Sequence, residues 1–180
     1  MFILNDEEKK SLKEIAKIAL NEAVLHNKRV EIDASKLPKK FSEHLGAFVT
    51  LKKNGRLRGC IGRFEPNQPL YETIIEMAIS ASRYDSRFPP VTPDELNEIT
   101  IEISVLTPRV RVNSIDDVVV GKDGIYVVYN GKNGTYLPQV ATDMGWNKEQ
   151  FVESCCIEKA GIPPEHCKDA ELYVYEAIVF

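Results

Sequence analysis

Apolar residues recur at helical spacing in three stretches of the chain. The first covers residues 6–27, behind an asparagine and an aspartate that suit an N-cap. The second runs from about residue 67 to 84, and the third from 147 to 160. In the third, Asn147 and Gln150 have the spacing of a capping box. The pattern therefore predicts three helices.

Alternating apolar and polar positions predict strands between these helices. Residues 47–62, AFVTLKKNGRLRGCIG, hold two strand-like runs around an Asn-Gly pair, which is typical of a two-residue hairpin turn. Residues 99–106, ITIEISVL, alternate strictly and predict a half-buried strand. Residues 124–140 read as a second hairpin, and residues 172–180 as a last strand.

The order of these elements predicts the fold class. Hairpins outnumber β-α-β units, which favours an α+β fold with a mostly antiparallel sheet and about three helices. The 180 residues fit a single domain spanning 1–180, which could consist of two lobes sharing a core. No apolar run is long enough for a membrane span, and the first residues lack the features of a signal peptide. We therefore expect a cytoplasmic protein.

The stretch RLRGCIG places one cysteine between two glycines. A regular strand puts the side chains of Arg58 and Cys60 on one face, where Cys60 is a candidate catalytic thiol and Arg58 a candidate anion-binding group. Gly59 and Gly62 would let a ligand or another segment approach the backbone closely. The competing interpretation is tight packing, in which a helix lies over the glycines and Cys60 is a small core residue.

The hairpin turn also predicts a register. With a two-residue turn and regular pairing, Arg58 faces Leu51 and Cys60 faces Val49. The thiol would then lie beside apolar neighbours, with guanidinium groups close by.

A second polar cluster lies in the proline-rich loop after the second helix. Asp85 and Arg87 are its candidate binding residues, because functional side chains often occupy such loops. The alternative is an Asp–Arg pair that only pins the loop.

The remaining chemistry is sparse. Phosphate-binding, dinucleotide-binding and zinc-binding motifs are absent from the sequence, so we predict neither a cofactor nor a metal site. Cys155 and Cys156 are expected to be core residues, and the four cysteines are expected to be reduced thiols. The net charge of −4 argues against a generally basic surface. A local basic concentration nevertheless surrounds the hairpin, at Lys52, Lys53, Arg56, Arg58 and Arg63.

Several strings together resemble the AMMECR domain family. They are GAFVTL, LRGCIG, the D-x-R-F-x-P of residues 85–90, EISVLTP, the LPQV that contains Gln139, the Gly-Trp pair that contains Trp146, and the KAG of residues 159–161. The resemblance runs from about Gly46 to Phe180, and LRGCIG, residues 57–62, is its signature. One departure is visible, because Cys167 stands where family members often have a tryptophan.

The resemblance implies an α+β fold with a larger and a smaller lobe. It also implies partners, because prokaryotic family members often occur beside or fused to a Memo-like protein and a radical S-adenosylmethionine (radical-SAM) protein. It implies no established activity.

Three hypotheses for function follow. The first is a binding module for Memo-like and radical-SAM partners, with the signature hairpin, Gln139 and Trp146 at the interface. The second is an enzyme that uses Cys60 as a reactive thiol, with Arg58 holding an anionic group. The third is an RNA- or DNA-binding module that uses the basic hairpin.

Overall fold

The computed structural model describes residues 2–65 and 67–180, which form two compact units. The first unit extends to Leu106 and also includes Ile178–Phe180, and the second is Thr107–Ala177. Each unit has a hydrophobic cluster of its own. Within each unit the strands pair in antiparallel fashion, which confirms the predicted α+β class.

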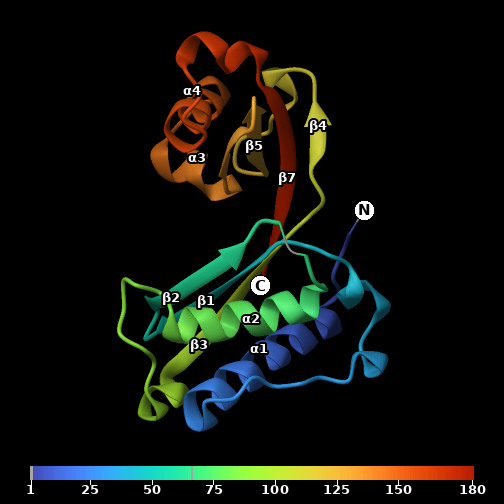
Figure 1. Ribbon diagram of the computed structural model, residues 1–180, viewed down its shortest axis with the longest axis vertical. Helices are drawn as coiled ribbons and strands as arrows, with labels where there is room; N and C mark the ends of the chain where they lie inside the picture. Colours follow the sequence, from blue (N-terminus) through green and yellow to red (C-terminus); the bar gives the residue numbers. More distant parts are fainter. Residues whose placement is uncertain (1, 66) are drawn as a thin grey trace. The chain divides into compact units, whose positions relative to one another are not determined.

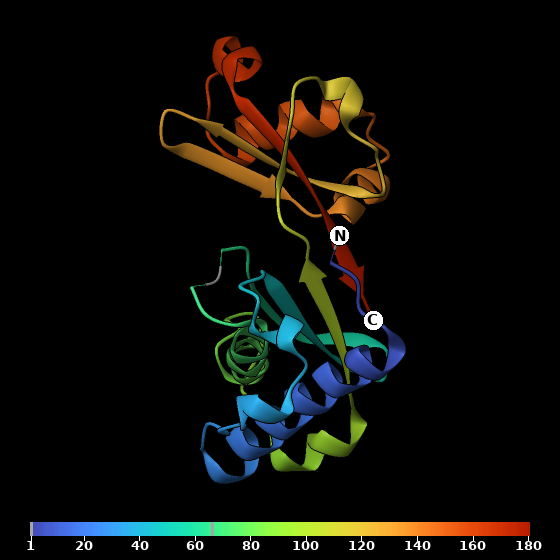
Figure 2. The ribbon, with the colours of Figure 1, turned by 90° about the vertical axis from the view of Figure 1, so that its right-hand side faces the viewer.

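The first unit is a three-stranded sheet packed against two helices (Figure 1). The strand order is β2-β1-β3, and the bounds are β1 Ala47–Lys53, β2 Arg56–Arg63, β3 Ile99–Leu106, α1 Asp6–His26 and α2 Leu70–Arg83. Phe180 extends this sheet beside β3, because it exchanges two backbone hydrogen bonds with Ile103. Figure 2 shows α1 (blue) and α2 (green) lying beside the strands of this sheet.

Local chemistry explains the element boundaries of the first unit. Asn5 and Glu8 form a reciprocal capping box at the start of α1. Asn54 and Gly55 have φ angles of 51° and 75°, the left-handed pair that a type I′ hairpin turn requires. The second helix begins at Leu70 rather than near residue 67, because proline occupies its N-cap position.

One face of this sheet is buried by both helices. Its fully buried members alternate along the strands, and they are Ala47, Val49, Leu51, Ile103 and Val105. These residues belong to one core cluster with apolar side chains of α1 and α2. The residues between them point to the opposite face of the sheet.

The second unit is a four-stranded sheet with short helices. The strand order is β6-β5-β7-β4, and the strand bounds are β4 Val110–Val112, β5 Asp123–Tyr129, β6 Lys132–Tyr136 and β7 Glu171–Val179. Its helices are α3 Pro138–Met144, α4 Lys148–Ser154 and a π-helix, Cys155–Lys159. Side chains of these helices and of β5 form the core of the unit.

The sequence pattern is least accurate in this unit. It misses helix α3, because the LPQV string fits the second predicted hairpin. The third predicted helix begins as expected behind the capping box of Asn147 and Gln150, but it changes to π-helical bonding at Cys155. The helical stretch ends near residue 160, as predicted, and Gly161 follows with a φ angle of 63°, the left-handed conformation that favours glycine after a helix.

The prediction of four reduced cysteines is wrong. Cys156 and Cys167 form a disulfide, and their Cα atoms are 6.0 Å apart. The chain turns at Gly161 and returns through a 3-10 helix, Pro164–Asp169, which places Cys167 beside the π-helix. Cys155 and Cys156 are both fully buried, as predicted.

No helix within residues 2–65 and 67–180 is both long enough and apolar enough to cross a membrane. In the same described part, no three His, Cys, Asp or Glu side chains lie close enough together to hold a metal ion.

Candidate functional site

The β1–β2 hairpin contains a β-bulge that resets its register. Lys52 pairs with Leu57, but Leu51 pairs with Gly59, so Arg58 is the extra residue of β2. The predicted pairing of Arg58 with Leu51 is therefore wrong. Beyond the bulge every partner is shifted by one position, and each side chain of β2 changes face relative to a regular strand.

The bulge separates Arg58 from Cys60. The Cys60 Sγ atom lies 3.1 Å from Oγ1 of Thr50, its partner on β1, rather than opposite Val49 as predicted. Arg58 instead shares a carboxylate partner, Glu95, with Lys53. Thr50 and Lys53 are three residues apart on one strand, so they point to opposite faces. The prediction that Arg58 and Cys60 share a face is therefore wrong.

The two glycines of the signature allow close contacts on opposite faces of the sheet. A Cβ atom on Gly59 would lie 2.2 Å from the carbonyl oxygen of Ala81, so α2 packs directly against the backbone there. A Cβ atom on Gly62 would lie 2.1 Å from the ring of Phe48, its partner on β1. Phe48 thus covers the bare backbone of Gly62, on the side away from the helices.

We use the name outer sheet face for the side of β2-β1-β3 that does not carry the helices. Strand register arranges its side chains in three rows, namely Leu57-Lys52-Thr100, Cys60-Thr50-Glu102 and Gly62-Phe48-Ser104. The middle row places a thiol, a hydroxyl and a carboxylate on neighbouring strands. Cys60 is a free cysteine and is partly exposed. Glu102 is held by Lys52, whose Nζ atom lies 2.8 Å from Oε2 of Glu102.

Asp85 and Arg87 bind the backbone of Cys60. The Cys60 N–H donates to Oδ2 of Asp85 at 2.9 Å, and the Cys60 carbonyl accepts from Nη2 of Arg87 at 3.3 Å. Arg87 also donates to both carboxylate oxygens of Asp85, from Nε at 2.9 Å and from Nη2 at 2.7 Å. Because β2 is an edge strand, this pair satisfies backbone groups that would otherwise be open to another chain.

The electrostatics follow from these contacts. The Asp85 side chain is 4% exposed and accepts four hydrogen bonds. The Arg87 guanidinium and the backbone N–H groups of Cys60 and Arg87 hold the pKa of Asp85 well below its usual range, against the effect of burial. Asp85 is therefore a permanent anion at neutral pH.

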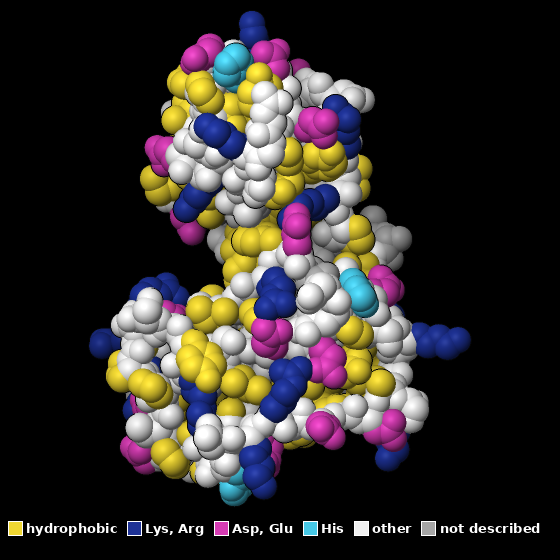
Figure 3. Space-filling view, in the orientation of Figure 1, with side chains coloured by type: hydrophobic (Ala, Val, Ile, Leu, Met, Phe, Trp, Pro, Cys, Tyr) yellow, Lys and Arg dark blue, Asp and Glu magenta, His cyan; other side chains and the backbone are white. Residues whose placement is uncertain are grey.

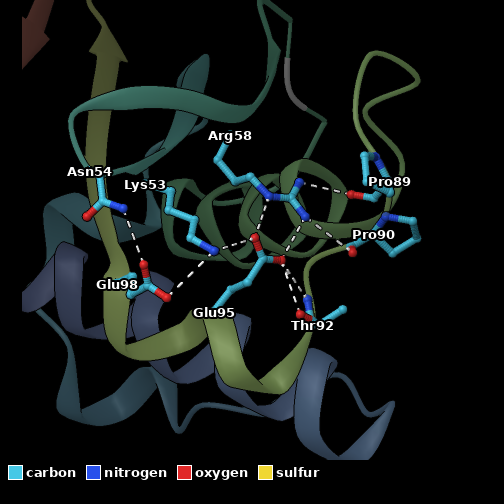
Figure 4. A network of polar contacts seen from close by, with 8 residues as sticks. All are labelled: Lys53, Asn54, Arg58, Pro89, Pro90, Thr92, Glu95 and Glu98. Atoms are coloured by element: carbon cyan, nitrogen blue, oxygen red, sulfur yellow. Dashed lines mark hydrogen bonds and ion pairs between the residues drawn. The ribbon is translucent and has the colours of Figure 1, made fainter.

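Arg58 makes the second connection between the hairpin and the proline-rich loop (Figure 4). Its Nε and Nη2 atoms donate to Glu95 at 3.0 and 2.8 Å, and both side chains are 12% exposed. Nη1 and Nη2 also donate to the carbonyls of Pro89 and Pro90, at 2.9 and 3.3 Å. The Arg58 guanidinium has the largest effect on the pKa of Glu95 and lowers it, and the Thr92 N–H lowers it further. Burial raises this pKa, but the net effect holds the pKa of Glu95 well below its usual range.

Two motifs that are separate in the sequence thus form one structure. We call it the double clamp, and it consists of Asp85 and Arg87 on the Cys60 backbone and of Arg58 and Glu95 on the loop. Arg87 of the D-x-R-F-x-P motif binds the carbonyl of Cys60, and Arg58 of the LRGCIG motif binds the carbonyls of Pro89 and Pro90. In this clamp Arg58 already has a carboxylate partner. The interpretation that Asp85 and Arg87 pin the loop is consistent with these contacts.

The basic concentration around the hairpin is largely paired with carboxylates. Four of its five cations form ion pairs, namely Lys52 with Glu102, Lys53 with Glu95 and Glu98, Arg58 with Glu95, and Arg63 with Glu76. The local positive charge that the sequence suggested is therefore mostly neutralised.

The other two predicted binding residues belong to the second unit. Gln139 is exposed near the start of α3, and its carbonyl accepts from Oγ1 of Thr142 at 2.8 Å. Trp146 lies between α3 and α4, and its ring centroid is 5.9 Å from that of Tyr136.

Comparison with known proteins identifies the family. The AMMECR1 family profile matches residues 13–180. The chain belongs to the AMMECR1 family. A Methanothermobacter thermautotrophicus protein is 44% identical over 178 residues, which cover 96% of this chain and 92% of the relative. Protein MJ0810 of Methanocaldococcus jannaschii is 38% identical over 172 residues, which cover 90% and 84%.

A solved structure agrees with this assignment. The crystal structure of the uncharacterized protein PH0010 from Pyrococcus horikoshii matches with a TM-score of 0.82 and 34% identity. The match covers 99% of this chain and 93% of that one.

Three residues of this AMMECR1-family site are missed by the sequence interpretation. Thr50 and Glu102 alternate with the apolar residues of β1 and β3, and this alternation is plain in the sequence. It alone could have placed both residues on the outer sheet face. Glu95 carries a different signal, because Thr92 and Glu95 form a capping box at the 3-10 helix Pro93–Glu98. Nothing in the local sequence shows that Glu95 also binds Arg58.

Because of the double clamp, the stability of the folded protein at acidic pH depends on Asp85 and Glu95. A carboxylate whose folded-state pKa is depressed contributes stability above its unfolded pKa, and that stability is lost as the pH falls toward the folded-state pKa. We therefore expect the free energy of unfolding to fall between about pH 5 and about pH 2. Asp85→Asn should cost about 2 kcal/mol at neutral pH and flatten this decline.

Urea unfolding across this pH range measures the effect. The matched control is Asp143→Asn, which changes an exposed carboxylate of α3 and should leave both the stability and its pH dependence unchanged. Equal pH profiles for the wild type and Asp85→Asn would show that Asp85 is not held as described.

Proposed function

We propose that this AMMECR1-family chain is a partner-binding domain and that the outer sheet face around Cys60 is its binding surface. The proposed partners are the Memo-like and radical-SAM proteins that the family resemblance implies, and the proposed location is the cytoplasm. Gln139 and Trp146 of the second unit are proposed as further partner contacts.

The observation that carries this proposal is the way Cys60 is presented. Its backbone N–H and carbonyl are both taken by the clamp, so the edge of β2 is closed to strand addition at this position. Its thiol points to the side away from the helices, next to the hydroxyl of Thr50. Recognition there must therefore use side chains of the face rather than the strand edge.

The composition of the face fits a protein partner. Phe48 and Leu57 provide apolar area, and Leu57 is 43% exposed. Cys60, Thr50 and Glu102 provide polar groups between them. Protein interfaces combine apolar and polar contacts in this way.

Nucleic-acid binding is less well supported. A non-specific nucleic-acid surface needs cations that are free to replace counterions on phosphates. Here Lys52, Lys53, Arg58 and Arg63 already have carboxylate partners. Figure 3 shows basic and acidic side chains interspersed over the face in view, without a continuous basic field.

An enzymatic role for Cys60 is the second candidate, because its thiol is free, partly exposed and within 3.1 Å of the Thr50 hydroxyl. The two candidates differ in what a serine at this position should do. Serine preserves the size and the polar contact of Cys60 but removes the thiol nucleophile. Cys60→Ser should therefore preserve partner binding and abolish thiol chemistry.

Partner capture tests the proposal. Thr50→Arg places a large cation in the middle row of the outer sheet face, and we expect it to lower co-purification of a Memo-like protein from the same organism at least about tenfold. The matched control is Ala34→Arg in the 3-10 helix Ala34–Lys36, which adds the same charge at an exposed residue of the first unit that lies outside the proposed surface. Unchanged capture by a folded Thr50→Arg variant would contradict the proposed surface.

A further inference from the structure

The second unit has a groove of about 270 Å³ between Trp146 and the outer side of helix α4, which we call the Trp146 groove. Besides Trp146, its lining comes from α4 and the π-helix that follows, namely Gln150, Glu153, Ser154, Ile157 and Glu158. Positions 150, 153, 154 and 157 share one face of a helix by their spacing. The other face packs into the core of the unit, because Phe151 and Cys155 are fully buried.

Tyr136 of β6 connects the two walls of this groove. Its ring centroid lies 5.9 Å from that of Trp146, and its hydroxyl oxygen lies 3.2 Å from Oγ of Ser154. Its ring also stacks on that of Phe151, with 5.9 Å between the centroids. These contacts hold the Trp146 ring beside the Ser154 side of the helix, and the Trp146 side chain remains partly exposed.

The Trp146 groove carries negative charge. Within the described part of the chain, its lining holds two exposed carboxylates, Glu153 and Glu158, and no cation. Two lysines of the same helical stretch have contacts elsewhere. Lys148 donates to the carbonyl of Asp116 at 3.1 Å, and Nζ of Lys159 lies 5.3 Å from the centroid of the Tyr136 ring. A tryptophan ring beside carboxylates attracts an organic cation by both its π face and the charge.

We propose that the Trp146 groove binds an arginine side chain of a partner protein, with the guanidinium stacked on Trp146 and its N–H groups directed to Glu153 and Glu158. A guanidinium suits this groove better than an ammonium group, because it is planar, stacks on aromatic rings and binds carboxylates through paired N–H groups. The apolar stem of the arginine would lie along Ile157. The inference deepens the proposed function and rests on it, since it names the group that Trp146 meets in a partner.

The first test uses the protein alone. Trp146 is the single tryptophan of the chain, so the indole N–H gives one NMR resonance that reports on the groove directly. The probes are acetyl-Gly-Arg-Gly-amide and the same peptide with citrulline, which has nearly the size of arginine but no charge. We expect the arginine peptide to shift this resonance saturably, with a dissociation constant of about 1 mM, and the citrulline peptide to leave it unchanged. Equal shifts with both peptides, or no shift with either, would overturn the inference.

Charge-neutralising variants locate the binding. The double substitution Glu153→Gln and Glu158→Gln removes both carboxylates at nearly constant size, and it should weaken the arginine peptide about tenfold. The control is Glu165→Gln, which neutralises an exposed carboxylate of the same unit outside the groove and should leave the affinity unchanged. An equal loss in the control and in the double variant would show a general charge effect and overturn the assignment.

Capture of the Memo-like protein separates this inference from the proposed function. The double variant at Glu153 and Glu158 should lower co-purification about tenfold, since a charge-assisted contact is lost. Capture that is lost in Thr50→Arg but unchanged in the double variant would overturn this inference and leave the outer sheet face as the binding surface. If the wild type captures no Memo-like protein, the proposed function fails, and the peptide titration decides whether the groove binds arginine.

Discussion

Replacing Arg58 with alanine is expected to lower the free energy of unfolding by about 3 kcal/mol. The substitution leaves Glu95 mostly buried without the guanidinium that binds both of its oxygens. It also removes the donors to the carbonyls of Pro89 and Pro90, so the loop loses one of its two connections to β2. Removing one member of a buried pair costs far more than removing an exposed one.

Arg63→Ala is the matched control for this prediction. Arg63 also lies on β2 and pairs with Glu76, but the two side chains are 35% and 32% exposed, so the loss should stay below about 1 kcal/mol. Arg58→Lys should recover only part of the stability, because an ammonium group cannot bind two carboxylate oxygens and two carbonyls in a planar fork. Urea unfolding of the three variants provides the comparison. A loss in Arg58→Ala no larger than that in Arg63→Ala would refute the role of Arg58 in the clamp.

Gly59→Ala is the second large effect that we expect, at about 3 kcal/mol. The added methyl group would lie 2.2 Å from the Ala81 carbonyl oxygen, and this neighbour is helix backbone rather than a flexible side chain. Either α2 or β2 must then move, which separates apolar groups that are buried between them.

Gly55→Ala distinguishes this steric effect from the general effect of losing a glycine. A methyl group on Gly55 would have no atom within 4 Å, but the residue has a φ angle of +75°. Its substitution should cost about 1 kcal/mol, from backbone strain alone. Thermal or urea unfolding that gives equal losses for the two variants would argue against close packing of α2 on Gly59.

Much of the fold could be predicted from local patterns. The Asn54-Gly55 turn, the N-cap of α1, the capping box of α4 and the strict alternation of β3 are all local signals, and the structure confirms each of them. These signals work because hydrogen bonds and side-chain periodicity within a few residues determine them.

The site could be predicted only in part, because a single β-bulge decides it. The sequence identified Arg58 and Cys60, but a regular strand placed them on one face, whereas the extra residue sends them to opposite faces. A bulge depends on contacts distant in sequence, here those of Arg58 with Glu95 and with the proline loop. The disulfide of Cys156 and Cys167 was missed for the same reason, because a chain reversal between them brings the two residues together.

The most direct test of the partner-binding surface is the alkylation rate of Cys60, measured by mass spectrometry of its peptide with and without a saturating Memo-like partner. Cys155 is an internal control, because it is fully buried and burial raises the pKa of its thiol to about 12, so it should stay unmodified in both samples. We predict that iodoacetamide modifies Cys60 in the free protein and that the partner slows this reaction at least about tenfold. A complex that forms while Cys60 reacts at its free rate would contradict the proposal that the outer sheet face binds the partner.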